Sequence, residues 1–220
     1  MNDLDAHEDA HETERRARLV AALDAAFPEP ACALHFENPF QLLVATVLSA
    51  QSTDVRVNLV TPALFARFPD PATLAVATVD DVIPFIRTVG LFNNKAKALV
   101  GLARRLVEHH GGAVPADLAA LTALPGVARK TANVVLQNAF ERNEGFVVDT
   151  HVARLAGRLG LSTGRTPEAI ERDLMAAFPA AAWARLSHQL ILHGRATCAA
   201  RRPACGLCAL APDCPSRGRP

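Results

Sequence analysis

Hydrophobic positions recur at helical spacing along most of the chain, and no segment shows the strict alternation that is typical of a half-buried strand. The segment 40–51 is apolar almost all round, which predicts a helix inside a bundle. Segments 94–112, 167–178 and 183–194 have the pattern of amphipathic helices, and the first of them ends in Gly-Gly. The pattern therefore predicts an all-α protein of short helices with brief connections.

Helix starts are marked by Asn38, Asp70 and Thr166, because each of these capping residues precedes a proline suited to the first helical turn. Residues 1–14 contain six acidic residues and no Lys or Arg, so we expect a flexible acidic tail there. No apolar run is long enough to cross a bilayer and the N-terminus has no signal-peptide pattern, which predicts a cytoplasmic protein.

The charged residues point to a nucleic-acid partner and to a small set of candidate nucleophiles. The formal net charge is +1, and because the N-terminal segment is acidic the remainder is basic, which suits DNA as well as an ordinary solvated surface. Of the 23 basic residues only three are lysines, namely Lys95, Lys97 and Lys130. Arg does not lose its proton in proteins, whereas Lys can become a neutral amine nucleophile, so these three positions are candidates for covalent chemistry.

Four of the five cysteines form a C-x6-C-x2-C-x5-C pattern near the C-terminal end: Cys198, Cys205, Cys208 and Cys214. In a cytosolic protein clustered cysteines are more often metal ligands than disulfides. Four thiolates suit either a tetrahedral zinc ion or an iron–sulfur cluster, and the single C-x2-C pair makes zinc the less typical choice. Cys32 stands alone, and we expect it to be a small buried hydrophobe.

Residues 117–140 predict a helix, a tight turn and a second helix. Gly126 can adopt the positive φ that a sharp reversal needs, and Leu124 is expected to anchor the turn in the core. The second helix would begin with backbone N–H groups and the positive end of its dipole, which favours a phosphate. An ordinary α-hairpin without a ligand fits these residues equally well.

Several motifs together resemble the endonuclease III family of DNA glycosylases. The segment LPGVARKTANVVL is similar to that family's helix-hairpin-helix, L-P-G-V-G-x-K-T-A, with Ala128 in place of the second glycine. Further matches are LLVATVLSAQSTD, TVGLFNNKAKAL, VVDTHVARL, LILHGRATC and the four-cysteine tail, so that the resemblance covers about residues 30–214.

The resemblance implies two catalytic residues. Lys130 would attack the sugar C1′, expel the damaged base and form a Schiff base that permits β-elimination. Asp149 would stabilise cationic sugar character or assist proton transfer, and it also suits the N-cap of the following helix.

The resemblance also implies residues that contact DNA. Gln51 and Leu91 would fill the gap left when the nucleotide is extruded, with Asp54 and His151 near the damaged-base pocket. The hairpin would bind the phosphate backbone through Leu124, Gly126 and Ala128. Apart from the resemblance, Arg201 and Arg202 lie on the loop between the first two cysteines, which bound metal would hold at both ends. We expect them to contact DNA, with ordinary solvated arginines as the alternative.

The fold that the resemblance implies has two helical domains flanking a DNA-binding cleft. A six-helix barrel with the hairpin would cover residues 33–143, and residues 15–32 and 144–220 would form a domain in which the four cysteines hold a [4Fe–4S] cluster.

The function that follows is a monomeric, bifunctional DNA glycosylase/AP lyase that acts on double-stranded DNA containing oxidised pyrimidines or abasic sites. Two alternatives remain open from the residues. One is a monofunctional adenine-mismatch glycosylase, although that pattern has Ser at the position of Lys130. The other is a non-catalytic DNA-binding protein stabilised by zinc.

Overall fold

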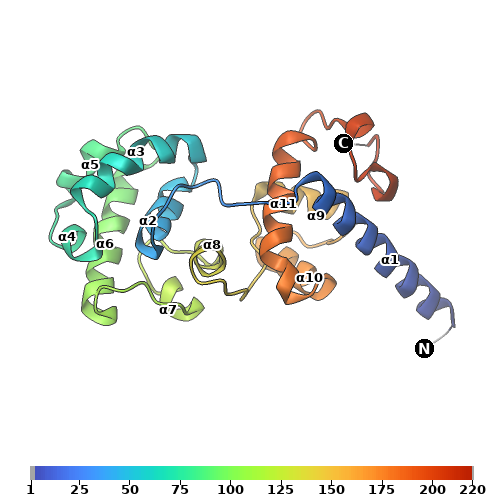
Figure 1. Ribbon diagram of the computed structural model, residues 1–220, viewed down its shortest axis with the longest axis horizontal. Helices are drawn as coiled ribbons and strands as arrows, with labels where there is room; N and C mark the ends of the chain where they lie inside the picture. Colours follow the sequence, from blue (N-terminus) through green and yellow to red (C-terminus); the bar gives the residue numbers. More distant parts are fainter. Residues whose placement is uncertain (1–2, 220) are drawn as a thin grey trace. The chain divides into compact units, whose positions relative to one another are not determined.

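The computed structural model describes residues 3–219 of the chain (Figure 1). The described residues form eleven α-helices and three short 3₁₀ helices, with no β-strand among them, so the all-α prediction is confirmed. Asn38, Asp70 and Thr166 are N-caps of helices that continue with proline, as their sequence context predicts. Within the same residues, no helix is both long enough and apolar enough to cross a membrane.

The chain divides into two compact units, each with its own apolar core. The middle unit is Cys32–Glu144, and the terminal unit combines Met1–Ala31 with Gly145–Pro220. The boundaries expected for a barrel domain and a cluster domain stay a prediction.

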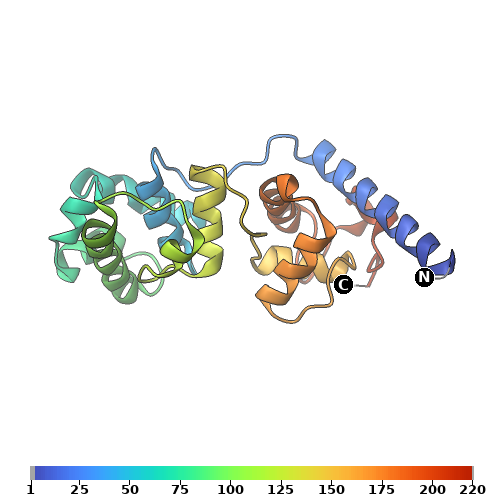
Figure 2. The ribbon, with the colours of Figure 1, turned by 90° about the horizontal axis from the view of Figure 1, so that it is seen from below.

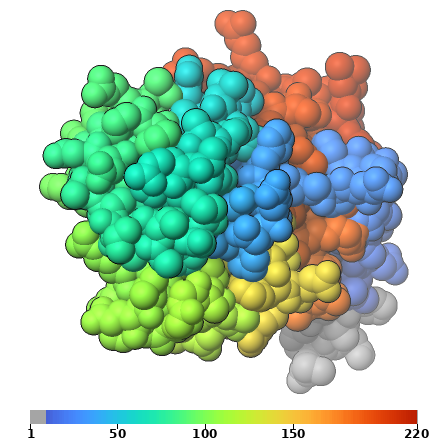
Figure 3. All heavy atoms as spheres, turned by 60° about the vertical axis from the view of Figure 1, so that its left-hand side comes forward, coloured from blue at the N-terminus to red at the C-terminus, as the bar shows by residue number. Residues whose placement is uncertain are grey.

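The middle unit is built around α2 (Pro39–Ser49), in which Phe40 and every residue from 42 to 48 are buried. This burial confirms the expectation of a helix inside a bundle. Helix α2 contacts α3, α6 and α8, and both ribbon views show it next to α8 (Figures 1 and 2). The space-filling view shows the cyan and green segments of this unit side by side on one of its faces (Figure 3). The other helices are α3 (Asp54–Arg67), α4 (Pro71–Ala75), α5 (Val79–Ile86), α6 (Phe92–His110), α7 (Leu118–Thr122) and α8 (Arg129–Ala139).

The terminal unit packs α11 (Trp183–Ala196) against α1 (Asp3–Ala26) and α9 (Thr150–Arg158). Its core joins residues of these helices to Phe146 and Val148 of the segment before α9, and three of the tail cysteines pack against it. The unit also contains α10 (Pro167–Ala177) and the 3₁₀ turns η1 (Ala180–Ala182), η2 (Cys205–Leu207) and η3 (Ala211–Asp213).

The structure differs from the flexible tail that the acidic composition predicts, because residues 3–14 form the first half of α1. Acidic residues are favourable at a helix N-terminus, where the macrodipole is positive. Glu12 also accepts hydrogen bonds from Arg15 at 2.7 Å and Arg16 at 2.8 Å, which lie three and four residues further along the helix. The bond from Arg15 is the main cause that lowers the pKa of Glu12 to about 2.

Candidate active site and metal centre

The hairpin predicted at residues 117–140 is present in the middle unit as α7, a tight turn and α8. Gly126 has a φ of +78°, a conformation that side-chain-bearing residues rarely adopt. Leu124 and Val127 are buried on either side of it, and the Val127 amide donates to the Leu124 carbonyl at 3.1 Å. The prediction that Leu124 anchors the turn in the core is therefore confirmed.

The hairpin turn is seated directly on α6. A Cβ atom at Gly126 would lie only 2.8 Å from the Cβ of Ala98, and one at Gly101 would lie 3.3 Å from the Pro125 ring. Because both distances are shorter than ordinary van der Waals contact, glycine at these two positions lets the turn and the helix approach each other closely.

Replacing Gly126 by Ala is expected to destabilise the middle unit through both backbone strain and overpacking. Gly111→Ala is a matched control, since Gly111 also has a positive φ, +58°, but nothing lies within 4 Å of an added Cβ there. We expect a loss of about 1–2 kcal/mol for Gly111→Ala and about 2–5 kcal/mol for Gly126→Ala in chemical denaturation. If both variants lost the same free energy of unfolding, the close contact between Gly126 and α6 would not contribute to the stability of the unit.

Ala128 is the N-cap of α8, with φ −84° and ψ 166°. Any residue adopts this extended conformation, so alanine in place of the family's glycine causes no backbone strain. Its methyl group offers no acceptor to the first turn of α8, in contrast to Asp117 and Asp149 at the starts of their helices. The start of α8 therefore keeps the positive end of its dipole without a capping oxygen from Ala128.

Lys130 is the second residue of α8 and its side chain is exposed. The other two lysines are placed differently. Lys97 is exposed on α6, away from the hairpin turn in sequence, whereas Lys95 is buried on the same helix. Lys130 is thus the accessible amine that follows directly on the hairpin.

Asp149 is the N-cap of α9 in the terminal unit, as its sequence context predicts. A single carboxylate oxygen, Oδ1, accepts from the amides of His151 and Val152, both at 2.8 Å. Since both cap bonds use Oδ1, the carboxylate is held rigidly while Oδ2 takes no part in the cap. His151 lies in the first turn of the same helix, where its Nδ1 is 3.1 Å from Nη2 of Arg154.

Gln51 and Leu91 share an unusual backbone conformation. Their φ angles are +54° and +57°, and in the described residues only Glu141 among the other non-glycine positions also has a positive φ. Such strain in a bulky residue like leucine persists only where the surrounding structure imposes it. Both side chains are exposed, with Leu91 54% accessible. Asp54 is nearby in sequence as the first residue of α3 and is half-buried.

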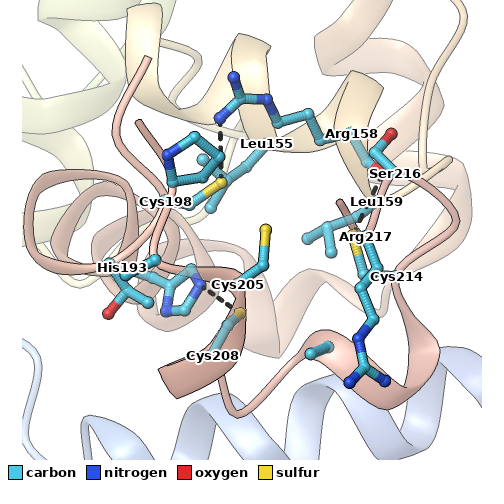
Figure 4. A pocket seen from close by; sticks show the side chains of 14 residues that line it. Leu155, Arg158, Leu159, His193, Cys198, Cys205, Cys208, Cys214, Ser216 and Arg217 are labelled. Carbon is cyan, nitrogen blue, oxygen red and sulfur yellow. Dashed lines mark hydrogen bonds between the residues drawn. The ribbon is translucent and has the colours of Figure 1, made fainter. Parts of the chain in front are cut away.

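The four tail cysteines line one cavity of the terminal unit, together with residues of α9 and α11 (Figure 4). Two polar side chains approach their sulfur atoms, and the Cys214 thiol donates to the Arg158 carbonyl at 3.6 Å. Nη1 of Arg158 donates to Sγ of Cys198 at 3.3 Å, and Nε2 of His193 lies 3.3 Å from Sγ of Cys208. Cys32 belongs to the other unit, where it packs against the apolar core.

Comparisons with known proteins agree on one family. The model of the HhH-GPD superfamily of base excision DNA repair proteins matches residues 44–180. Endonuclease III of Synechocystis sp. is 50% identical over 207 residues, which cover 94% of this chain and 94% of that protein. Endonuclease III of Escherichia coli is 44% identical over 200 residues, or 91% and 94% of the two chains. The chain belongs to the endonuclease III family.

Solved structures of the family agree with this assignment. A trapped covalent intermediate of an endonuclease III with DNA matches with a TM-score of 0.88 at 38% identity, over 94% of this chain and 97% of that one. A non-covalent endonuclease III–DNA complex matches with a TM-score of 0.89 at 37% identity, over 94% and 96%. The protein is accordingly a DNA N-glycosylase and AP lyase of base excision repair.

Endonuclease III proteins carry a [4Fe–4S] cluster, and the cysteine cavity fits it. All four thiols line this cavity, and four cysteine thiolates are the ligand set that such a cluster takes. Burial, together with the other three cysteines, raises the pKa of the Cys208 thiol, so four thiolates need a bound cation to compensate their charge.

The loop between the first two cysteines is fixed at its base and exposed at its tip. Arg158 donates to the carbonyl groups of Ala199 at 2.8 Å and Ala200 at 2.7 Å. Arg201 and Arg202 follow directly and are both exposed. The arrangement therefore presents two guanidinium groups on a loop whose start is held.

Sequence reasoning missed three polar residues that organise these sites. Arg158 and His193 contact cysteine sulfur atoms from α9 and α11. Lys95 is buried on α6 and donates to the Leu48 carbonyl at the end of α2 and to Ser52 just after it. The scarcity of lysine drew attention to Lys95 as much as to Lys130, but nothing in the sequence indicated that it would be buried.

The cysteine assignment predicts which thiols hold iron. Cys208→Ala is expected to lose the iron and sulfide of the purified protein and its visible absorption, because a missing ligand opens the cluster to solvent. Cys32→Ala is the matched control and should retain all three. The measurement is the iron and sulfide content per chain. Loss of iron in Cys32→Ala alone, or zinc in place of iron in the unaltered protein, would contradict the assignment.

Proposed function

We propose that the enzyme removes oxidised pyrimidines from double-stranded DNA with Lys130 as its nucleophile, and then cleaves the strand 3′ to the abasic sugar. The observation that carries the proposal is the exposed amine of Lys130 in the first turn of α8, directly after the hairpin. A solved endonuclease III was trapped in a covalent bond with DNA, which is consistent with a nucleophilic side chain. Lysine at position 130 also argues against the adenine-mismatch glycosylase, whose pattern has serine there.

The proposed reaction divides into base removal and strand cleavage. The neutral amine of Lys130 attacks C1′ while the bond from C1′ to the base breaks, and the base leaves with a proton. The sugar ring opens to give a Schiff base between C1′ and Nζ, which acts as an electron sink. A general base on the enzyme or a water molecule then removes a proton from C2′. The electron pair of that C–H bond moves toward the Schiff base, and the bond between C3′ and its phosphate oxygen breaks, so that the phosphate leaves.

Asp149 supplies the negative charge in this proposal. Its carboxylate is fixed by two amide bonds to Oδ1, so it can face developing positive charge on the sugar without reorganising. The same group can assist proton transfer in the reaction.

The remaining predicted residues are proposed to hold the DNA. The hairpin residues Leu124, Gly126 and Ala128 present the start of α8 to a phosphate. Gln51 and Leu91 fill the gap beside the orphaned base, and Asp54 and His151 lie toward the damaged base. The exposed Arg201 and Arg202 contact the backbone. We propose that the enzyme acts in this way as a monomer in the cytoplasm.

Borohydride trapping on a duplex with a single thymine glycol tests Lys130. The unaltered enzyme is expected to form a covalent adduct, and Lys130→Ala is expected to form none while base removal falls by at least about 10³-fold. Lys97→Ala is the matched control, since Lys97 is also exposed and lies in the same unit. An adduct that persists in Lys130→Ala would assign the chemistry to another amine.

Asp149→Asn separates the charge of Asp149 from its capping role. Asn caps a helix about as well as Asp, so thermal stability should stay nearly unchanged while base removal falls by about 10²-fold. Thr166→Ala is the converse control. It removes the cap of α10 and is expected to cost about 1 kcal/mol of stability without changing the rate. Full activity in Asp149→Asn would reduce Asp149 to a structural residue.

A further inference from the structure

A buried lysine joins the start of α6 to the end of α2 and the loop that follows it. Lys95 lies in the first turns of α6 and is only 5% exposed. Its Nζ donates to the Leu48 carbonyl at 2.8 Å and to Oγ of Ser52 at 3.0 Å. Lysine is almost never this buried without a functional or structural partner. Burial lowers the pKa of Lys95, because removing the charged ammonium from water costs free energy.

The partners of Lys95 explain why an ammonium is tolerated there. Leu48 belongs to the last turn of α2, where the carbonyl groups carry the negative end of the helix dipole. A cation that donates to such a carbonyl is stabilised by it, and the Ser52 hydroxyl supplies a second acceptor. The amine is enclosed by these contacts, which excludes it as a nucleophile for the sugar.

Ser52 extends the connection from Lys95 to a second loop. Its Oγ also accepts from the amide of Gly90 at 3.1 Å. The two loops approach so closely that a Cβ at Gly90 would lie 3.1 Å from the Gln51 carbonyl oxygen. Lys95, Ser52 and Gly90 therefore form one hydrogen-bonded bridge from the end of α2 to the start of α6.

The bridge lies beside both strained residues of these loops. Ser52 directly follows Gln51 and Gly90 directly precedes Leu91, and these two residues have φ angles of +54° and +57°. A left-handed conformation in non-glycine residues costs about 1–3 kcal/mol each and persists where surrounding contacts determine it. The bridge supplies such contacts through the residues next to Gln51 and Leu91, while the side chains of Gln51 and Leu91 themselves remain exposed.

We infer that Lys95 is a positioning residue which, through Ser52 and Gly90, holds Gln51 and Leu91 in the geometry needed to enter the DNA stack together. The inference rests on the proposed gap-filling role of these two residues. Extruding a nucleotide costs a few kcal/mol, and loops that are already ordered lose less entropy when they fill the gap. Lys95 thus acts on base extrusion and has no part in the bond-breaking steps.

Ser52→Ala is the sharpest test, because it cuts the bridge between the loops and leaves the bond from Lys95 to Leu48 in place. Ser49→Ala is its matched control. The Ser49 hydroxyl, at the end of the same helix, donates only to the Thr46 carbonyl at 2.9 Å and joins no second loop. The substrate is a duplex with thymine glycol opposite 2-aminopurine, whose fluorescence rises when the base is unstacked.

Ser52→Ala is expected to slow single-turnover base removal by about 5- to 30-fold, because it removes the two hydrogen bonds that the Ser52 Oγ accepts from Lys95 and Gly90. The fluorescence rise should slow by the same factor. Cleavage of a duplex with a preformed abasic site should change less, because no base has to be extruded. Ser49→Ala should match the unaltered enzyme in all three measurements.

Lys95→Met keeps the apolar stem and removes the donor, and about a tenfold or larger loss of base removal is expected. The double variant Lys95→Met/Ser52→Ala should lose less than the product of the two single losses, since both changes remove the bond between Lys95 and Ser52. If Lys95→Met does not fold, Ser52→Ala still decides the question.

Two results would overturn the inference while the proposed function stands. One is a Ser52→Ala enzyme that matches Ser49→Ala in base removal and fluorescence. The other is an equal loss of base removal and abasic-site cleavage with a lowered melting temperature, which would show a merely structural role. Failure of the unaltered enzyme to remove thymine glycol would overturn the proposed function and this inference together.

Discussion

Gly126 approaches α6 so closely that a Cβ there would lie 2.8 Å from the Cβ of Ala98. This contact fixes the hairpin turn on the helix. Leu91 is the N-cap of the same helix, and Gln51 directly precedes Ser52, which accepts a hydrogen bond from Lys95 of α6. Three residues before Ala98, the buried amine of Lys95 ties α6 to the end of α2 and to the loop of Ser52. Helix α6 therefore fixes the hairpin turn and the two strained residues, Gln51 and Leu91, relative to one another.

The terminal unit depends on a different kind of constraint. Four thiols line one cavity, and the charge of four thiolates has to be compensated by the cofactor. Helix α9 borders this cavity through Arg158 and has Asp149 at its other end. The cofactor that this unit holds is thus bound against the helix that fixes the candidate catalytic carboxylate.

Local patterns predicted a large part of the fold and site. The N-caps, the buried character of α2, the hairpin turn and the capping role of Asp149 each depend on a few neighbouring residues, so the sequence reveals them. The spacing of the cysteines likewise placed them at one site, but the choice of an iron–sulfur cluster over zinc needed the resemblance. The acidic composition did not indicate that residues 3–14 belong to α1, in which Glu12 pairs with Arg15 and Arg16.

What the sequence could not show are contacts between residues far apart in the chain. The bonds of Lys95 to Leu48 and Ser52 span 47 and 43 residues, and that of Ser52 to Gly90 spans 38. No periodicity or spacing encodes such partners, because the tertiary fold brings them together.

The two lysines show how environment decides the role of one residue type. Both stand near the start of a helix in the same unit, Lys95 on α6 and Lys130 on α8. Lys95 is enclosed and donates to two fixed oxygens, so its amine is held in place and has no access to a substrate. Lys130 is exposed at the hairpin, so its amine can reach a substrate. Arginine cannot form a Schiff base, and its planar guanidinium is larger than an ammonium, so lysine suits the role proposed for each of the two positions in a chain rich in arginine.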